Sequence, residues 1–348
     1  MTPYRVALLG LGTVGREVAR LLIQRPDELA DRAGGRRLDL VGVSARDPRR
    51  LEDLPLPGGA MVVSDPASLV DHDHVDAIVE VIGGIDPAGD LVQAALRNGK
   101  AVVTANKALL ARQGAALERL SRETNAPLRF EASVMGPTPV LSVLAEDLVA
   151  MEVDRIRGVV NGTTNWILDA VEHEGMTADE ALAKAQSFGY TEADPALDTE
   201  GHDAAQKLVV LARLAFGRWI AEDSVQRTAD QPPGKGGAGI SRVTADEVQA
   251  ASERGERIRL VATVTHDDEG RIDATALPRA LAGDDPLAQA RGITNVVEIE
   301  GPPQGRVVIT GPGAGGPATA AGIVADLVRL ARGSGSTWAG LPPADEEP

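Results

Sequence analysis

The chain contains no cysteine, which excludes disulfides, thiolate metal sites and a cysteine nucleophile. Aromatic residues are scarce: 3 Phe, 2 Tyr and 3 Trp among 348 residues are too few for the stacking platforms that bind single-stranded nucleic acid. Basic residues are outnumbered, with 35 Lys and Arg against 51 Asp and Glu and a formal net charge of -16. Such a surface repels phosphate backbones and anionic lipid, so we expect neither nucleic-acid nor membrane partners; a solvated surface alone explains the charge.

Long apolar runs and targeting signals are missing as well. No stretch approaches the roughly 18 apolar residues that span a bilayer, and the N-terminus begins with a strand-like run instead of a signal peptide. We therefore expect a soluble, cytoplasmic protein. At about 150 residues per domain, its length predicts two domains.

Lysine is also scarce. Only five of the 35 basic residues are lysines: Lys100, Lys107, Lys184, Lys207 and Lys235. Lys differs from Arg in being a compact proton donor that titrates readily when it is desolvated. In a chain that uses Arg for general surface charge, each Lys is a candidate for chemistry.

Short apolar runs alternate with helical patterns over the first 133 residues, which is typical of βαβ units and a parallel sheet. The predicted strands are residues 5–9, 38–44, 77–82, 101–104 and 128–132, and the predicted helices are 14–24, 87–97, 108–124 and, near the end of the chain, 319–331. From residue 153 the pattern indicates an α+β domain, with strands at 153–160, 258–265, 296–300 and 307–310 and helices at 166–174, 177–188, 199–216 and 245–254. We expect residues 231–239 to form a surface loop and residues 334–348 to be a disordered tail.

Residues 10–15 (GLGTVG) form a G-x-G-x-x-G motif between a strand and a helix. Its glycines permit a tight turn, close approach to a pyrophosphate and helix packing, while the helix N-terminus faces the phosphates. With the βαβ series, the motif predicts a Rossmann-type doubly wound α/β domain that binds a dinucleotide. The second strand ends in Ser44-Ala45-Arg46 and not in the carboxylate that usually selects NAD, which favours NADP. The alternatives are that the nearby arginines are solvated and that Asp47 turns inward.

Asp203 and Lys207 are four residues apart and share one face of a predicted helix. At this spacing an Asp–Lys pair is usually a surface salt bridge. Because the helix is otherwise apolar and the chain seldom uses Lys, a catalytic pair is an equal alternative. Glu192 and Asp198, in the preceding loop, are suited to a substrate ammonium, unless Asp198 only caps the helix.

Thr104 ends the predicted strand at 101–104 and Lys107 follows it, at the position where open α/β sheets bind ligands. A surface role for Lys107 at a helix start is the alternative. Glu131 and the turn after it offer a carboxylate and carbonyls to a hard cation, although an ordinary strand-end turn explains them as well. The five histidines show no ligand spacing within a helix, so we expect no zinc site.

Seven segments resemble homoserine dehydrogenases, in that family's order: residues 10–15, 80–84, 99–111, 130–136, 158–168, 189–212 and 311–327. The stretch GYTEADPALDTEGHDAAQK, at residues 189–207, is highly specific. The resemblance implies the reversible NAD(P)H-dependent reduction of L-aspartate 4-semialdehyde to L-homoserine, in threonine, methionine and isoleucine biosynthesis.

The same resemblance implies roles for individual residues. Lys207 is the proton donor and acceptor at the substrate oxygen, and Asp203 and Glu192 contact homoserine. Lys107 is a further catalytic residue, which lies near the nicotinamide and assists in positioning or proton transfer. The expected cofactor site comprises Gly10, Gly12, Thr13, Val14, Gly15, Arg46, Thr104, Lys107, Gly189 and Gly313. A sodium ion is expected on the Glu131 carboxylate and on the backbone carbonyls of Val134, Gly136 and Thr138.

The family's fold implies that the final glycine-rich segment and helix return to the nucleotide-binding domain. We therefore expect a discontinuous nucleotide-binding domain of residues 1–136 and 303–333. Residues 137–302 form the substrate and dimerisation domain of a homodimer.

Three features depart from the family pattern. Pro137 and Thr138 stand where many members have Gly and Ile, and residues 231–239 have no counterpart. The chain lacks the C-terminal ligand-sensing domain of many members, so threonine feedback through it is not expected. A dehydrogenase for another semialdehyde and a non-catalytic cofactor sensor are alternative functions; the presence of Lys107, Asp203 and Lys207 argues against the sensor.

Overall fold

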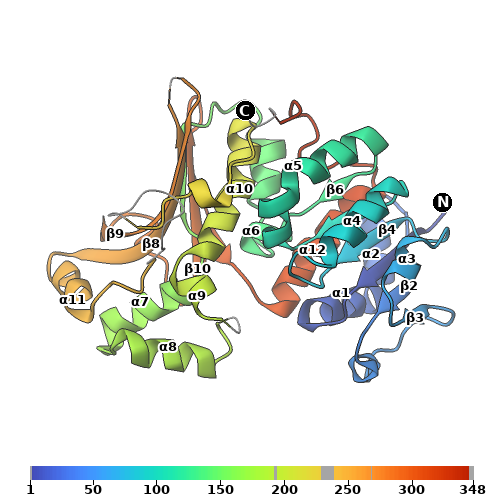
Figure 1. Cartoon of the computed structure of the whole chain (residues 1–348), viewed down its shortest axis with the longest axis horizontal. Coiled ribbons are helices and arrows are strands. Elements are labelled where there is room, and N and C mark those ends of the chain that lie inside the picture. The colour runs from blue at the N-terminus through green and yellow to red at the C-terminus, as the bar shows by residue number, and fades with distance from the viewer. Residues whose placement is uncertain (1, 192–193, 229–238, 268, 345–348) are drawn as a thin grey trace. The chain divides into compact units, whose positions relative to one another are not determined.

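The protein divides into two compact units in a computed structural model that describes residues 2–191, 194–228, 239–267 and 269–344. The first unit comprises residues 1–145 and 314–344, and the second comprises residues 146–313. Each unit is built on its own sheet (Figure 1).

Six parallel strands form the sheet of the first unit, in the order β3-β2-β1-β4-β5-β6. They are β1 (Tyr4–Leu9), β2 (Leu38–Ser44), β3 (Met61–Val63), β4 (Ala77–Glu80), β5 (Ala101–Thr104) and β6 (Leu128–Arg129). The strand order reverses at β1, and ligands of such sheets bind beyond the carboxyl ends of the strands at this reversal. The predicted doubly wound parallel sheet is confirmed.

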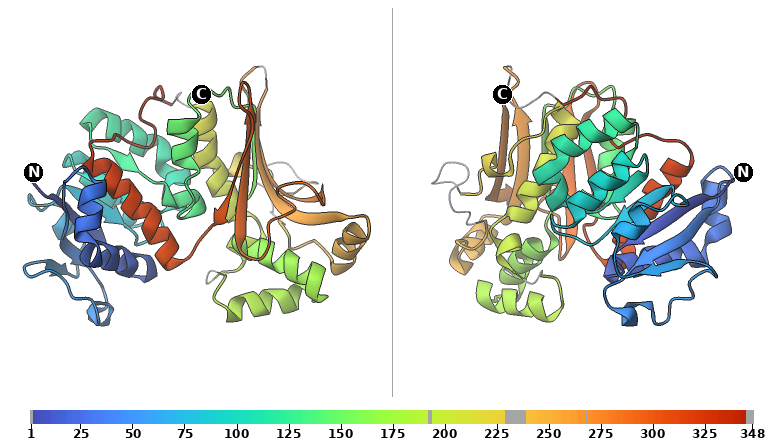
Figure 2. Two further views of the ribbon diagram at one scale, coloured as in Figure 1. Left: turned by 180° about the vertical axis from the view of Figure 1, so that it is seen from behind. Right: turned by 45° about the vertical axis from the view of Figure 1, so that its right-hand side comes forward.

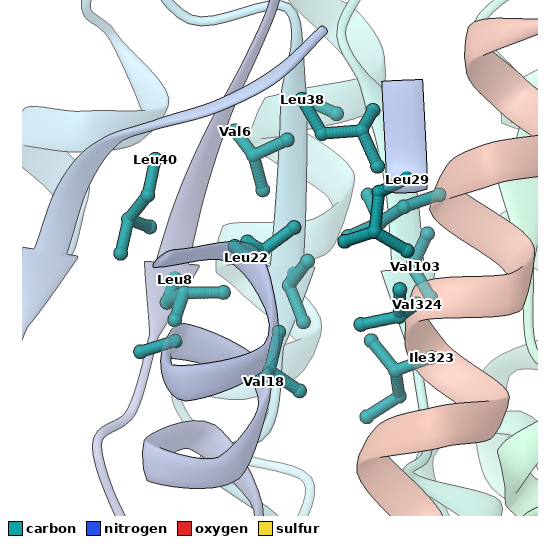
Figure 3. Packing of buried hydrophobic residues seen from close by; sticks show 14 of the residues in the cluster. Val6, Leu8, Val18, Leu22, Leu29, Leu38, Leu40, Val103, Ile323 and Val324 are labelled. Atoms are coloured by element: carbon teal, nitrogen blue, oxygen red, sulfur yellow. The ribbon is translucent and has the colours of Figure 1, made fainter. Parts of the chain in front are cut away.

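Helices cover both faces of this sheet. On one face α1 (Thr13–Gln24), α2 (Pro26–Arg32) and α12 (Gly316–Ala331) share an apolar core with β1 and β2, shown in Figure 3. Right-handed crossovers put α4 (Ala88–Arg97) and α5 (Lys107–Thr124) on the other face (Figure 2). The remaining helical segments of this unit are short: α3 (Ala67–Val70), α6 (Ala132–Met135) and a 3-10 helix at Pro48–Leu51.

Five antiparallel strands form the second sheet, in the order β11-β10-β7-β8-β9. They are β7 (Arg155–Val159), β8 (Glu256–His266), β9 (Ile272–Ala282), β10 (Thr294–Gly301) and β11 (Gly305–Pro312). The helices are α7 (Gly162–Glu174), α8 (Ala178–Ser187), α9 (Ala196–Thr199), α10 (His202–Phe216) and α11 (Ala245–Glu253), with a 3-10 helix at Glu222–Ser224 and a π-helical turn at Val143–Asp147 between the units. The predicted α+β second domain is confirmed. Across the described residues, no helix is at once long enough and apolar enough to cross a membrane.

Several elements differ from their sequence prediction. The helix predicted at 199–216 begins only at His202, as α10, and a separate short helix, α9, ends at Thr199, because Gly201 between them adopts a left-handed φ of 80°. Strand β9 was not predicted, since it contains Pro278. That proline is tolerated because β9 lies at the edge of its sheet.

The boundaries of the two units also differ from those expected. Residues 303–313 lie with the second unit, because β11 pairs with β10 along its whole length. Residues 137–145 lie with the first unit. The chain therefore leaves the first unit later, and returns to it later, than we expected from the family's fold.

The prediction of a disordered tail is wrong for residues 334–344. Trp338 is 1% exposed, with its ring centroid 5.2 Å from that of Phe130. The Thr337 N–H donates to the Leu128 carbonyl at 3.1 Å, and its hydroxyl accepts the Phe130 N–H at 3.2 Å. The tail thus covers the edge strand β6. The buried side chain of Trp338 holds it there, which the composition of the segment did not predict. Residues 345–348 lie outside the described part of the chain.

We expect Trp338→Ala to destabilise the first unit by about 3–5 kcal/mol, since it leaves a large cavity against Phe130. Urea unfolding followed by circular dichroism measures the loss. Trp166→Ala, at a half-buried position in the second unit, is the matched control and should cost less. Equal midpoints for Trp338→Ala and the wild type would show that the tail does not stabilise the fold.

Candidate functional site

The turn between β1 and α1 is shaped by two glycines. Gly10 has a φ of 101°, and a Cβ there would lie 2.9 Å from the Val81 carbonyl oxygen. A Cβ on Gly15 would lie 2.1 Å from the Gly10 carbonyl oxygen. Gly12, which caps α1, has open space where its Cβ would stand. The first and third motif glycines are therefore required by packing, and the second leaves room for a ligand at the helix N-terminus, beside Thr13 and Val14.

A cavity of about 460 Å³ lies at this turn and is lined by Gly10, Leu11, Gly12, Ser44, Ala45, Arg46, Asp47, Ser64, Pro66, Val81, Ile82 and Pro87. The Ser44 hydroxyl accepts the Gly10 N–H at 3.2 Å, which joins the ends of β1 and β2. Arg46 is exposed at the cavity. Asp47 accepts the N–H of Arg49 at 3.1 Å and pairs with its guanidinium at 2.9 Å. The Asp47 carboxylate is therefore engaged in a local ion pair at the start of the 3-10 helix.

Glu80, which we did not single out from the sequence, joins the ends of β4 and β5. It is fully buried. One carboxylate oxygen accepts the N–H groups of Ile82 at 2.8 Å and Gly83 at 3.1 Å, and the other accepts the Thr104 hydroxyl at 2.6 Å. The signal that could have identified Glu80 is its position as the last residue of an otherwise apolar strand. A buried carboxylate needs hydrogen-bond donors, so its partners had to lie nearby.

The start of α5 is tied to the same loops. Asn106 donates to the Gly84 carbonyl at 2.6 Å and accepts the Leu109 N–H at 3.1 Å, which caps the helix. The Thr104 hydroxyl accepts the Asn106 N–H at 3.0 Å. Lys107, the first residue of α5, is half-buried at this anchored helix start.

Lys207 and Asp203 form a buried pair on α10. Each residue is 7% exposed. The Lys207 Nζ lies 2.8 Å from Asp203 Oδ2 and donates to the Val160 carbonyl at 2.5 Å. A surface salt bridge is therefore excluded for this pair, and the ammonium has a defined direction.

Asn161 and Asn295, both missed by the sequence analysis, belong to the hydrogen-bond network around Lys207. Asn161 donates to Asp198 Oδ1 at 2.7 Å and to Asp203 Oδ2 at 2.8 Å. Asn295 donates to the Val160 carbonyl at 2.9 Å, so that this carbonyl accepts from both Asn295 and Lys207. Asp198, which is 4% exposed, lies within this network. The alternative that it caps the following helix is wrong, because it lies inside α9 and Gly201 is the N-cap of α10.

Two glycines of the second unit were expected at the cofactor, and one of them, Gly313, adjoins the Lys207 network through Asn295. Gly189, with a φ of 71°, ends the turn after α8, and the next carbonyl, that of Tyr190, accepts the Thr163 hydroxyl at 2.6 Å. A Cβ on Gly313 would lie 2.0 Å from Asn295 Nδ2, so only glycine fits there. Glu192 lies outside the described residues, as do residues 231–238 of the predicted surface loop.

Glu131 is 3% exposed, and burial raises the pKa of its carboxyl group, with the nearby Asp326 carboxylate adding to the rise. Its two oxygens accept the N–H groups of Leu141 at 2.9 Å and Ser142 at 2.8 Å. Val134 lies in α6, and Gly136, which has a φ of 55°, and Thr138 follow this helix; all three residues are buried. The Glu131 carboxylate is therefore desolvated and precedes a buried segment.

Two other lysines have structural partners. Lys100 donates to the carbonyls of His72 at 2.7 Å and Val75 at 3.0 Å, and burial lowers its pKa. Lys184 pairs with Glu174 at 2.7 Å on the surface. Lys107 and Lys207 thus remain the two described lysines at candidate sites.

Asp169, Glu172 and His173 on α7 are close enough together to bind a metal ion. However, Arg259 lies 3.2 Å from Glu172 and Arg291 lies 2.9 Å from Asp169. Guanidinium groups thus neutralise these carboxylates, and the trio is an ion-pair network.

Comparison with known families assigns both parts of the chain. The family model described as "Homoserine dehydrogenase" matches residues 139–328, and the one described as "Homoserine dehydrogenase, NAD binding domain" matches residues 10–131. The chain is 39% identical to homoserine dehydrogenase of Corynebacterium glutamicum, across 98% of this chain and 76% of that protein. It is 34% identical to that of Bacillus subtilis, across 95% and 73%.

Solved structures show the same similarity. The homoserine dehydrogenase of Thiobacillus denitrificans has a TM-score of 0.88 and 36% identity, across 95% of this chain and 73% of that chain. A hyperthermophilic archaeal homoserine dehydrogenase in complex with NADPH has a TM-score of 0.74 and 30% identity, across 94% and 97%.

Proposed function

The chain belongs to the homoserine dehydrogenase family, and we propose that Lys207 exchanges the proton with the substrate oxygen in the reaction of this family. The protein is an NAD(P)-binding oxidoreductase that interconverts L-aspartate 4-semialdehyde and L-homoserine. The observation that carries the assignment is the buried Lys207 ammonium, directed by Asp203 and the Val160 carbonyl.

The chemistry of Lys207 follows from this position. When bound, NAD(P)H would supply a hydride to the aldehyde carbon, which would leave negative charge on the carbonyl oxygen. An N–H of Lys207 then donates its proton to that oxygen and gives the hydroxyl of homoserine. In the reverse direction the neutral amine takes the hydroxyl proton. Asp203 stabilises the ammonium form and fixes its direction.

The carboxylates around Lys207 are suited to the substrate's ammonium group. Asp198 and Asp203 are buried beside Lys207. Carboxylate oxygens are hydrogen-bond acceptors suited to an ammonium group. Both substrates carry an α-ammonium group. We assign Asp198 and Asp203 to its recognition, together with Glu192.

The residues at the carboxyl ends of β1, β4 and β5 fit a dinucleotide. Packing that admits only glycine at Gly10 and Gly15, with open space at Gly12, is suited to a pyrophosphate at the N-terminus of α1. Thr13, Val14, Thr104, Gly189 and Gly313 complete the proposed cofactor contacts. Lys107, at the anchored start of α5, is proposed to lie near the nicotinamide.

We propose that the protein prefers NADP to NAD. The cavity presents the Ser44 hydroxyl and the exposed Arg46 where a carboxylate would select the ribose of NAD. Asp47, the carboxylate that offered an alternative, is paired with Arg49. A guanidinium at this position favours a 2′-phosphate.

We also propose a sodium ion at Glu131 and the carbonyls of Val134, Gly136 and Thr138. Glu131 accepts from the N–H groups of Leu141 and Ser142 and from the Ser142 side chain, and its carboxylate is the anionic ligand in this proposal. The ion would neutralise Glu131 and stabilise the turn at residues 134–138.

The family resemblance further implies a homodimer formed through the second sheet. Support comes from its edge strand β11, along which Val308 is 41% exposed. Sedimentation velocity tests this state: a monomeric mass at micromolar concentration contradicts it.

We expect Lys207→Ala to lower kcat for homoserine oxidation about 10²–10⁴-fold, the usual effect of removing a positioned proton donor. NADPH affinity, measured by fluorescence titration, should change less than about threefold, since such a donor acts on the substrate oxygen. Lys184→Ala, which removes a surface ion pair, is the control. Loss of both turnover and cofactor binding in Lys207→Ala would indicate a folding role instead.

We expect Arg46→Glu to raise KM for NADP about tenfold or more, because a charge-assisted hydrogen bond contributes roughly 1.5–3 kcal/mol. KM for NAD should change little, since NAD has no 2′-phosphate. Arg97→Glu on α4 makes the same charge change outside the cavity and should leave both values unaltered. Equal increases for the two cofactors in Arg46→Glu would refute the assignment.

We expect Na⁺ to raise the melting temperature of the wild type above its value in choline chloride of equal ionic strength, because a bound ion stabilises the folded state. Glu131→Gln should abolish this difference. Differential scanning fluorimetry measures both. The sodium site is wrong if the wild type melts at the same temperature in the two salts.

A further inference from the structure

Asn161 uses both ends of its side-chain amide at the Lys207 site. It follows β7 and caps α7, where its Oδ1 accepts the Thr164 N–H at 2.8 Å and the Thr164 hydroxyl at 2.9 Å. Its Nδ2 donates to Asp198 at 2.7 Å and to Asp203 at 2.8 Å. One side chain, 5% exposed, therefore connects the starts of α7 and α10 with α9.

The orientation of this amide is determined by its partners. The cap requires an acceptor toward the Thr164 N–H, and the two carboxylates require a donor. A flipped amide would direct its NH₂ at a backbone N–H and its oxygen at two carboxylates. Asn161 is thus a donor to both acids in the observed orientation alone.

Two buried carboxylates that lie this close repel one another. The Asn161 NH₂ group gives one hydrogen to each of them, and the same Oδ2 of Asp203 also accepts from Lys207. Loss of the bridging donor would therefore separate the acids and shift the carboxylate that directs the Lys207 ammonium.

We propose that Asn161 is a positioning residue for the reaction, whose amide keeps Asp198 and Asp203 side by side and so directs Lys207 toward the substrate oxygen. This inference rests on the proposed role of Lys207. In this proposal Asn161 contacts neither the hydride nor the transferred proton. Its neutral amide instead determines the direction of the proton donor, Lys207.

Asn161→Asp isolates this role, because the new side chain has the same shape and still caps the helix. Only the donor is lost, and a third carboxylate takes its place. Among the described residues, the titratable side chains hydrogen-bonded to Asn161 are Asp198 on α9 and Asp203 on α10, with Lys207 next to Asp203. The Val160 carbonyl, just after β7, and the Asn295 amide on β10 belong to the same network and do not titrate.

The variant should show a characteristic pH dependence. Three adjacent carboxylates bind a proton at a higher pH than an isolated one, because like charges disfavour full ionisation. Once the cluster is protonated, a carboxyl O–H donates where the amide N–H did. The activity of Asn161→Asp relative to the wild type should therefore rise as the pH falls.

The experiment measures kcat and KM for L-homoserine oxidation with saturating NADP from pH 6 to pH 9, with the folded fraction determined at each pH. We expect kcat of Asn161→Asp to be about 10- to 100-fold low at pH 8, with the deficit several-fold smaller at pH 6. Asn165→Asp is the matched control: it makes the same change in α7, at a buried amide that donates to the Gly292 and Thr294 carbonyls. Its kcat per folded molecule should follow that of the wild type at every pH.

Two further variants separate the possible outcomes. Asn161→Ala removes the donor without adding charge, so it should lower kcat at all pH values, and it decides the question if Asn161→Asp does not fold. Wild-type kcat in Asn161→Ala, or a pH-independent deficit in Asn161→Asp, overturns the proposal. Lys207→Ala is measured alongside: if it retains turnover, the role of Lys207 itself is wrong, whereas an inactive Lys207→Ala with fully active Asn161 variants overturns only the role of Asn161.

Discussion

The buried ammonium of Lys207 is the charge on which the arrangement of the second unit depends. A charge this well removed from water needs an anion and further acceptors, which Asp203 and the Val160 carbonyl provide. Asp203 in turn accepts from Asn161, and Val160 from Asn295. Helices α7, α9 and α10 and strands β7 and β10 therefore meet at one polar network within an apolar unit.

The first unit contains a buried anion, Glu80, which also needs hydrogen-bond partners. Glu80 joins the loops after β4 and β5 through three hydrogen bonds, and Asn106 extends the connection to the start of α5. The nucleotide end of the sheet is thus built on a rigid, fully paired frame. A preorganised site binds its ligand more tightly, because no free energy is lost in ordering the loops on binding.

Chain order and spatial order differ most at the C-terminus. After β11, the chain returns to the first unit as α12, where Ile323 and Val324 enter the apolar core shown in Figure 3. The following segment covers the edge of β6 with Trp338. Residues 334–344 are mostly small residues and proline around Trp338, so no periodic pattern marks this segment as ordered. Its order comes from a long-range aromatic contact.

The sequence by itself determined the parallel sheet, the α+β second domain, the glycine motif and the family, because hydrophobic periodicity and short motifs are local properties of the chain. It also directed attention to Lys207 through the scarcity of lysine. Only the tertiary structure decided that Lys207 and Asp203 are buried, that Asp47 turns to Arg49, and that Glu80, Asn161 and Asn295 complete the polar networks. Burial and hydrogen-bond partnership depend on residues distant in sequence: Asn161 and Asp203 are 42 positions apart. No spacing rule within one helix or strand reaches across that distance.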